Sequence, residues 1–197
     1  MAVTPRPYHH GNLRLALLEQ AERTLADGGE LSLRELARQI GVSHAAPRRH
    51  FPDKQALLDA LAEDGFERLG DALRDALGKA GDDFEARMLA FARAYAGFAV
   101  DHAALLELMF AGKHRPDAAE SLRQAADRAF EASLALFVEG QATGDVVAGD
   151  PERIGMVVFG TVHGLAALAN SQMLDRAALD DLLAAAVERL VLGLRPR

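Results

Sequence analysis

The stretch from residue 31 to residue 54, LSLRELARQIGVSHAAPRRHFPDK, constrains the fold more than any other part of the chain. Its first apolar residues recur at helical spacing, and Ser32 stands three positions before Glu35, the spacing of a helix-capping box. Gly41 then predicts the end of this helix, because a left-handed backbone is needed there and glycine adopts it without strain. The stretch therefore begins with a short capped helix and a tight turn.

A second short helix is predicted to follow the turn. Ser43 can cap it, Phe51 and Pro52 close it, and basic residues crowd the positions between them. A helix, a tight turn and a short basic helix form the helix-turn-helix pattern, which places its second helix in the DNA major groove. The sequence therefore predicts DNA binding.

The charge of the chain is unevenly distributed, although its net value of −7 at first argues against a DNA-binding protein. Residues 1–57 carry eight arginines and lysines against six acidic residues, whereas the remainder carries 14 against 23. Four of the seven histidines also lie in the first segment. A small basic unit on a larger acidic body fits this distribution, although an excess this small also arises by chance.

Several classes of protein are excluded or disfavoured by composition and motifs. There is no cysteine, so disulfides, thiolate metal sites and cysteine nucleophiles are excluded. The N-terminus lacks the apolar core of a signal peptide, and the longest apolar run, Met156 to Ala169, is shorter than the ~18 residues of a membrane span. No phosphate loop, HExxH motif or catalytic triad signature appears. We expect a soluble cytoplasmic protein that is not an enzyme and has no cofactor, metal site or membrane contact.

The rest of the chain is predicted to be helical. No segment alternates with the period of two that a strand shows, and alanine and leucine are abundant throughout. We expect an all-α fold of about nine helices, with a DNA-binding domain over residues 1–53 and a larger helical domain over residues 54–197. Turn signals place helices between Asn12 and Gly28, from Asp53 to about Gly78, at 84–100 and 103–110, from Pro116 to about Gly140, and near 152–174 and 177–193.

The sequences YHHGNLR and LSLRELARQIGVSHAAPRRHFPDKQALL resemble the N-terminal domain of the TetR family of bacterial transcriptional regulators over residues 8–62. Phe159-Gly-Thr-Val-His163-Gly164 is similar to a subgroup motif that has tryptophan at the Phe159 position. The resemblance implies a three-helix DNA-binding domain on a larger helical domain that binds a ligand and dimerises. Its last two helices, here near 152–174 and 177–193, would form a four-helix bundle with those of a partner.

The resemblance and the chemistry of the residues together suggest how DNA is contacted. His44 and Ala45 would meet base edges, because histidine can donate to a purine acceptor and alanine can pack on a thymine methyl group. Family members usually have tyrosine at the Arg48 position, and arginine there keeps a phosphate donor. Phosphate contacts are expected from Arg48, Arg49, His50 and Lys54, with Ser32 and Ser43 adding anion sites and Arg6 and Tyr8 belonging to an extended N-terminal arm.

Simpler interpretations exist for some of these residues. His50 could pack under Phe51, and Arg49 could pair with an acidic residue of the same domain. Arg34 and Arg38 alternate with Glu35 and are expected to lie on a solvated helix face.

The effector site is expected among the middle helices, where most of the aromatic residues are concentrated. An apolar cavity with few polar groups would suit a small lipophilic ligand. Aromatic residues at helical spacing are nevertheless more often ordinary core residues. The candidate pocket residues are Met88, Phe91, Tyr95, Phe98, His102, Met109, Phe130, Phe159 and His163.

The sequence therefore favours a repressor that binds a palindromic operator as a homodimer and that a small-molecule effector releases. The alternative is a helical dimer that binds a small molecule or a protein partner without sequence-specific DNA binding. The arginine at position 48 is the feature that supports this alternative.

Overall fold

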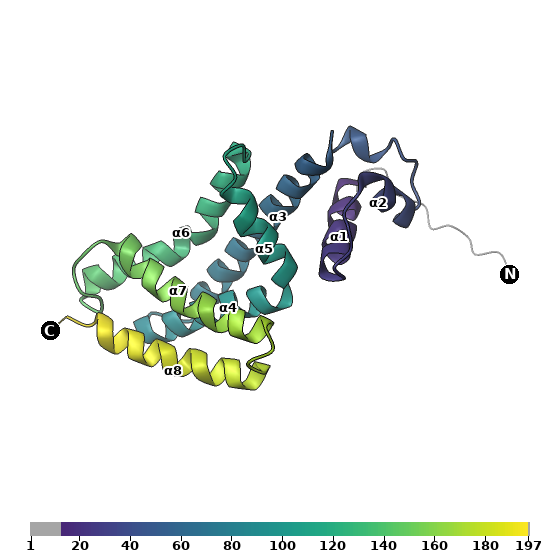
Figure 1. Cartoon of the computed structure of the whole chain (residues 1–197). Coiled ribbons are helices and arrows are strands. Elements are labelled where there is room, and N and C mark those ends of the chain that lie inside the picture. The colour runs from purple at the N-terminus through teal and green to yellow at the C-terminus, as the bar shows by residue number, and fades with distance from the viewer. Residues whose placement is uncertain (1–12, 197) are drawn as a thin grey trace.

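The structure is a computed structural model that describes residues 13–196 of the chain (Figure 1). Over this range it contains α-helices and one single-turn 3-10 helix, η2, but no strand, so the all-α prediction is confirmed. About nine helices were expected, and residues 13–196 contain eight α-helices besides η2. In chain order the elements are α1 (Leu13–Ala26), α2 (Leu33–Gln39), η2 (Pro47–Arg49), α3 (Lys54–Lys79), α4 (Phe84–Asp101), α5 (Ala103–Lys113), α6 (Glu120–Thr143), α7 (Pro151–Asn170) and α8 (Arg176–Leu194).

The first three elements form a small unit at one end of α3 (Figure 1). Leu17, Leu36 and Phe51 are buried where these elements meet. The caps predicted from sequence are confirmed: the Ser32 hydroxyl accepts a hydrogen bond from the amide of Glu35 at 3.3 Å. Gly41 has a φ of +74°, the left-handed conformation expected after α2. The N-cap predicted at Asn12 lies outside the described residues.

The second helix of the motif is shorter than predicted. Ser43 does not cap an α-helix: residues 44–46 form a turn, and only Pro47–Arg49 are helical, as η2. The cause is Pro47, which lacks the amide that would donate to the carbonyl of Ser43 in an α-helix and whose ring would collide with that carbonyl. The chain instead makes hydrogen bonds between residues three positions apart, as in a 3-10 helix. The Ala46 amide donates to the Ser43 carbonyl, and the His50 amide donates to the Pro47 carbonyl.

The long helix α3 joins this unit to the rest of the molecule (Figure 1). Asp53 caps it as predicted, since its carboxylate accepts from the Ala56 amide at 2.8 Å. The far part of α3 packs against α4, α5 and α6, and α7 and α8 form the outer layer beside α4. One helix start was wrong: Pro116 lies in a turn closed by a hydrogen bond from the Ala118 amide to the Arg115 carbonyl, and α6 begins at Glu120.

Candidate nucleic-acid interface and effector cavities

The candidate DNA-contacting side chains lie on the open surface of the helix-turn-helix. Pro47 and Phe51 are buried and anchor the segment in the domain. Their neighbours therefore face solvent. The exposed candidates are Ser32, Ser43, His44, Ala45, Arg48, Arg49, His50 and Lys54, while Arg6 and Tyr8 lie outside the described residues.

The basic residues of this surface are available for phosphate. Among residues 13–196, no carboxylate lies within ion-pair distance of Arg48, Arg49 or Lys54. Arg38 behaves differently, because its guanidinium pairs with Glu35 on the solvated face of α2. Arg49 therefore has no carboxylate partner among the described residues. The candidate phosphate contacts are different residues from those of the Arg38–Glu35 ion pair on α2.

His50 lies beside the buried ring of Phe51 but remains exposed. The two ring centroids are 6.5 Å apart and inclined by 52°, and the guanidinium of Arg14 covers Phe51 at 5.8 Å from its centroid. His50 is thus beside Phe51 rather than packed beneath it, and its imidazole can reach solvent or a phosphate.

An ionic cluster connects the helix-turn-helix unit to the body of the molecule. The carboxylate of Glu22 on α1 accepts two hydrogen bonds from the Arg68 guanidinium on α3, at 2.7 and 2.9 Å. His102, at the junction of α4 and α5, places its Nδ1 atom 2.8 Å from the same carboxylate. The hydrogen bonds from Arg68 lower the pKa of Glu22 below its ordinary value. Three segments far apart in sequence therefore meet at one carboxylate.

Replacing Glu22 by glutamine should lower the free energy of unfolding by about 1 kcal/mol at pH 7, since a half-buried charge-assisted pair is lost and solvent screens part of its energy. Because the folded pKa of Glu22 lies below 4.5, its contribution is present above this pH and disappears as the pH falls through the folded pKa. The difference from the parent protein should therefore shrink towards pH 3.5. Urea unfolding at both pH values measures it, with Glu19→Gln on the exposed face of α1 as the matched control. An equal loss at both pH values would show that the carboxylate charge is not what stabilises the contact.

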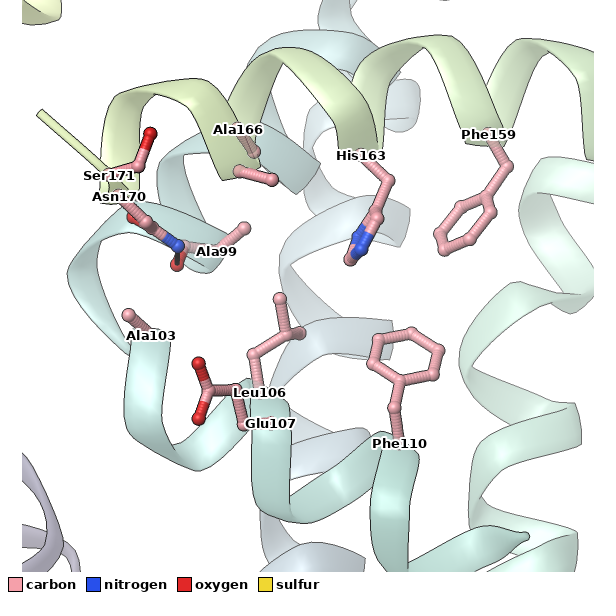
Figure 2. Close-up of a pocket in the computed structure, with 11 residues that line it drawn as sticks. Ala99, Ala103, Leu106, Glu107, Phe110, Phe159, His163, Ala166, Asn170 and Ser171 are labelled. Atoms are coloured by element: carbon pink, nitrogen blue, oxygen red, sulfur yellow. Dashed lines mark hydrogen bonds between the residues drawn. The ribbon is translucent and has the colours of Figure 1, made fainter. Parts of the chain in front are cut away.

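Two cavities flank α7. The first lies between α5 and α7 and has a volume of about 590 Å³. Figure 2 shows Phe159 and His163 of α7 pointing towards Leu106 and Phe110 of α5 across this α5–α7 cavity. Asn170 also lines this cavity, and its amide donates to the Ala99 carbonyl at 3.1 Å.

The second cavity lies between α6 and α7, has a volume of about 490 Å³, and is walled largely by phenyl rings. Phe110 and Phe159 line both cavities, with ring centroids 6.0 Å apart, and so form the partition between them. The apolar walls and the volumes suit a small lipophilic ligand. The phenylalanines that line this α6–α7 cavity are Phe91, Phe110, Phe130, Phe137 and Phe159.

A hydrogen bond from a buried tyrosine fixes the orientation of His163, the imidazole that lines the α5–α7 cavity. The phenol oxygen of Tyr95 lies 2.8 Å from Nδ1 of His163, and Tyr95 is fully buried. Burial raises the pKa of Tyr95, so its phenol stays neutral over the physiological range. The ring of Phe159 packs edge-on against Tyr95 at 5.1 Å. Tyr95 therefore orients His163 and Phe159 from behind the cavity wall.

Both halves of the chain match models of one protein family. A model described as bacterial regulatory proteins, tetR family, matches residues 17–61, and one described as the tetracyclin repressor-like C-terminal domain matches residues 88–194. The chain belongs to the TetR family of bacterial transcriptional regulators. This family consists of regulators and not of enzymes.

Individual relatives agree with the membership in the TetR family. The HTH-type transcriptional regulator Rv1816 of Mycobacterium tuberculosis is 31% identical over 137 residues, which span 66% of this chain and 58% of that regulator. A structure of a protein of unknown function from Rhodococcus sp. RHA1 is 48% identical, covers 98% of this chain and 100% of that one, and has a TM-score of 0.90. The regulator FadR from Bacillus subtilis, in complex with stearoyl-CoA, shares the fold at 16% identity, covering 92% of this chain and 99% of its own, with a TM-score of 0.70.

The structure of this TetR-family chain brings together only part of the predicted effector site. Phe91, Phe130, Phe159 and His163 line one or both cavities. The other predicted residues are not in the walls of these two cavities: His102 belongs to the ionic cluster with Glu22, Phe98 packs against His102, Tyr95 lies behind His163, and Met88 and Met109 are fully buried in the core.

Besides three exposed acidic residues at its rim, the α6–α7 cavity has two polar lining residues that sequence reasoning missed. Lys113 lies at the end of α5, and Ser133 lies on the buried face of α6. The sequence carries a signal only for Ser133, which is a polar residue at a position whose helical neighbours Ala126, Ala129 and Phe137 are apolar and buried.

Proposed function

We propose that this TetR-family regulator is a repressor that binds an inverted-repeat operator as a homodimer and that a small, largely apolar effector releases it from DNA. The observation that carries the proposal is the exposed basic surface around η2, with no internal carboxylate partner among the described residues, at one end of a helix whose other end packs beside two apolar cavities. A regulator of this kind acts in the cytoplasm, where its DNA is.

The mechanism is thermodynamic linkage through α3. A dimer would present two helix-turn-helix units to major-groove half-sites about one helical turn, ~34–36 Å, apart. A ligand that favours a different spacing of the two units then weakens operator binding, and the operator weakens ligand binding by the same factor. The contact of Glu22 with Arg68 and His102 gives the DNA-binding unit a second connection to the α4–α5 junction, next to the α5–α7 cavity.

The outer face of α7 supports the dimer. Met156 and Val157 are about two-thirds exposed, and Leu168 is also exposed. A Cβ atom added at Gly160 or Gly164 would meet nothing within 4 Å in the protomer. Small residues between exposed apolar ones let a second helix approach closely, and on α8 Leu182 and Leu192 are also exposed.

The apolar composition of α7 also raises the question whether this helix crosses a membrane or packs against protein. By length and composition alone α7 could cross a membrane, although the apolar run seen in the sequence was expected to be too short. Its residues Val158, Val162 and Ala166 are buried against the protomer, and α7 packs on α4, α6 and α8. The apolar face that remains is of the kind that a partner subunit covers.

The ligand class is supported by the walls of the cavities and by one structural neighbour. FadR, which shares the fold, binds stearoyl-CoA, a molecule with a long apolar chain. The phenyl-lined cavities of this chain suit an apolar body of that kind.

Selection of the purified protein against a randomised duplex library at physiological salt tests the proposal. An enriched inverted repeat is expected and would give the operator sequence. Retention without enrichment would contradict it and favour the second candidate, a helical dimer that binds a small molecule or protein partner without sequence-specific DNA binding. The observation that favours this candidate is the single turn of η2, which offers fewer positions to base edges than an α-helix.

Single substitutions in the helix-turn-helix should separate phosphate from base contacts. Arg48→Ala or Lys54→Ala is expected to weaken binding to all duplexes and to reduce the salt dependence of log affinity by about 2, because each protomer of the homodimer loses one phosphate contact. His44→Ala should instead change the preferred sequence. Fluorescence anisotropy on specific and random duplexes measures both effects, with Arg34→Ala on the solvated face of α2 as control. Equal losses on the two duplexes for His44→Ala would exclude its role in base recognition.

A further inference from the structure

The hydroxyl of Ser133 is a buried polar group without a partner. Ser133 is 5% exposed and lines the α6–α7 cavity, and its Oγ atom has no hydrogen bond to any residue of the 13–196 range. A buried hydroxyl without a partner destabilises the folded state, because it has lost its hydrogen bonds to water. A ligand group that hydrogen-bonds to it would recover this loss, so Ser133 marks the position of a polar ligand atom.

Lys113 lines the same cavity and is also incompletely paired. Its ammonium lies 4.9 Å from the ring centre of Phe110 and 5.9 Å from that of Phe66. No carboxylate of the described residues is within ion-pair distance of it; Asp127 acts on the ammonium only at longer range, and desolvation, the larger effect, lowers the pKa of Lys113. Two phenyl faces stabilise the charge only in part. An anionic ligand group would complete the environment of this ammonium.

The rim of the cavity limits the charge that such a ligand can carry. Asp127, Glu131 and Glu152 line the opening and are exposed, so water solvates their carboxylates. They repel further negative charge near the entrance. A ligand with several phosphates is therefore disfavoured, whereas one charge placed inward against Lys113 is not.

We propose that the α6–α7 cavity binds an amphiphilic monocarboxylate, with its carboxylate held by the ammonium of Lys113 and the hydroxyl of Ser133 and its apolar body among the phenyl rings. Both groups donate to the carboxylate oxygens, and charge-assisted hydrogen bonds of this kind are the strong ones. The inference rests on the proposed function, since it names the effector class of the same region. It assigns roles to two residues that were not among the candidate pocket residues predicted from the sequence.

Three probes with one chain and different head groups test the proposal on the unmodified protein. Decanoate, decanol and decylammonium are titrated calorimetrically below the concentrations at which they form micelles. Decanoate is expected to bind at least about tenfold more tightly than either of the others, because only it pairs with the ammonium. Decanol or decylammonium binding as tightly as decanoate would overturn the proposal, and so would tighter binding of decanoyl-CoA, titrated in the same way as a fourth probe.

Two substitutions assign the effect to the named groups. Lys113→Met, which keeps the side-chain length, should bring decanoate affinity down to that of decanol. Ser133→Ala should lower decanoate affinity about fivefold to tenfold and decanol affinity less, because the decanol hydroxyl makes only a neutral hydrogen bond, while the melting temperature stays the same or rises because an unpaired buried hydroxyl is removed. Lys79→Met, on the exposed end of α3, is the control and should change nothing. Selectivity for decanoate that survives Lys113→Met would overturn the assignment.

The outcomes for this site and for the proposed function are distinguishable. Selective decanoate binding without release of the selected operator would confirm the carboxylate site and contradict its role as the effector site. An enriched operator together with no selective decanoate binding would do the opposite: the repressor function would stand and the ligand class would be wrong.

Discussion

Replacing Gly164 by leucine is expected to lower operator affinity at least about 100-fold, because linked binding to two half-sites is lost when the dimer cannot form. Gly164 is exposed, and a Cβ at this position meets nothing within 4 Å, so leucine should fit the isolated protomer. In the proposed dimer it would stand between two closely packed helices and force them apart. Sedimentation velocity measures the oligomeric state, and anisotropy with the selected operator measures the affinity.

The control for this prediction is Gly78→Leu. Gly78 is also exposed on a helix, α3, and a Cβ there likewise meets nothing within 4 Å, but it lies away from the outer face of α7. The control should remain dimeric and bind the operator as the parent protein does. Circular dichroism and the melting temperature of both variants show whether the protomer is folded. A Gly164→Leu protein that remains dimeric with full operator affinity would exclude α7 from the interface.

Local chemistry accounts for what the sequence predicts well. Ser32, Asp53 and Gly41 act through hydrogen bonds or backbone angles within a few residues, so the helix ends that they control are where the sequence places them. Pro47 also acts locally, and its missing amide explains why the second helix of the motif is only one turn long. The prediction of an α-helix from Ser43 was wrong because residue 47 is the first position at which an α-helical hydrogen bond to that cap would form.

The candidate sites depend on contacts that periodicity cannot reveal. Met88 and Phe91 both lie on the inner face of α4, yet Met88 is in the solid core and Phe91 lines a cavity. The difference is set by how α5, α6 and α7 cross, which no pattern within α4 records. The contact of Glu22 with His102 likewise joins residues 80 positions apart, so His102 was predicted to line the effector site although it lies in the ionic cluster.

Gly70→Val in α3 should have the largest effect on stability, lowering the free energy of unfolding by about 3 kcal/mol through overpacking. A Cβ at Gly70 would lie 3.0 Å from the Cα atom of Ala129, which is backbone of α6 and cannot rotate away. The closest approach of α3 and α6 would have to widen, and α3 also positions the DNA-binding unit. Gly97→Val in the middle of α4 is the matched control, because a Cβ there meets nothing within 4 Å. Urea unfolding should show little change for this control, since valine and glycine differ by only about 0.5 kcal/mol in helix propensity. Equal stabilities of the two variants would mean that α6 moves freely against α3, and the linkage through α3 would then lose its rigid connection to the cavities.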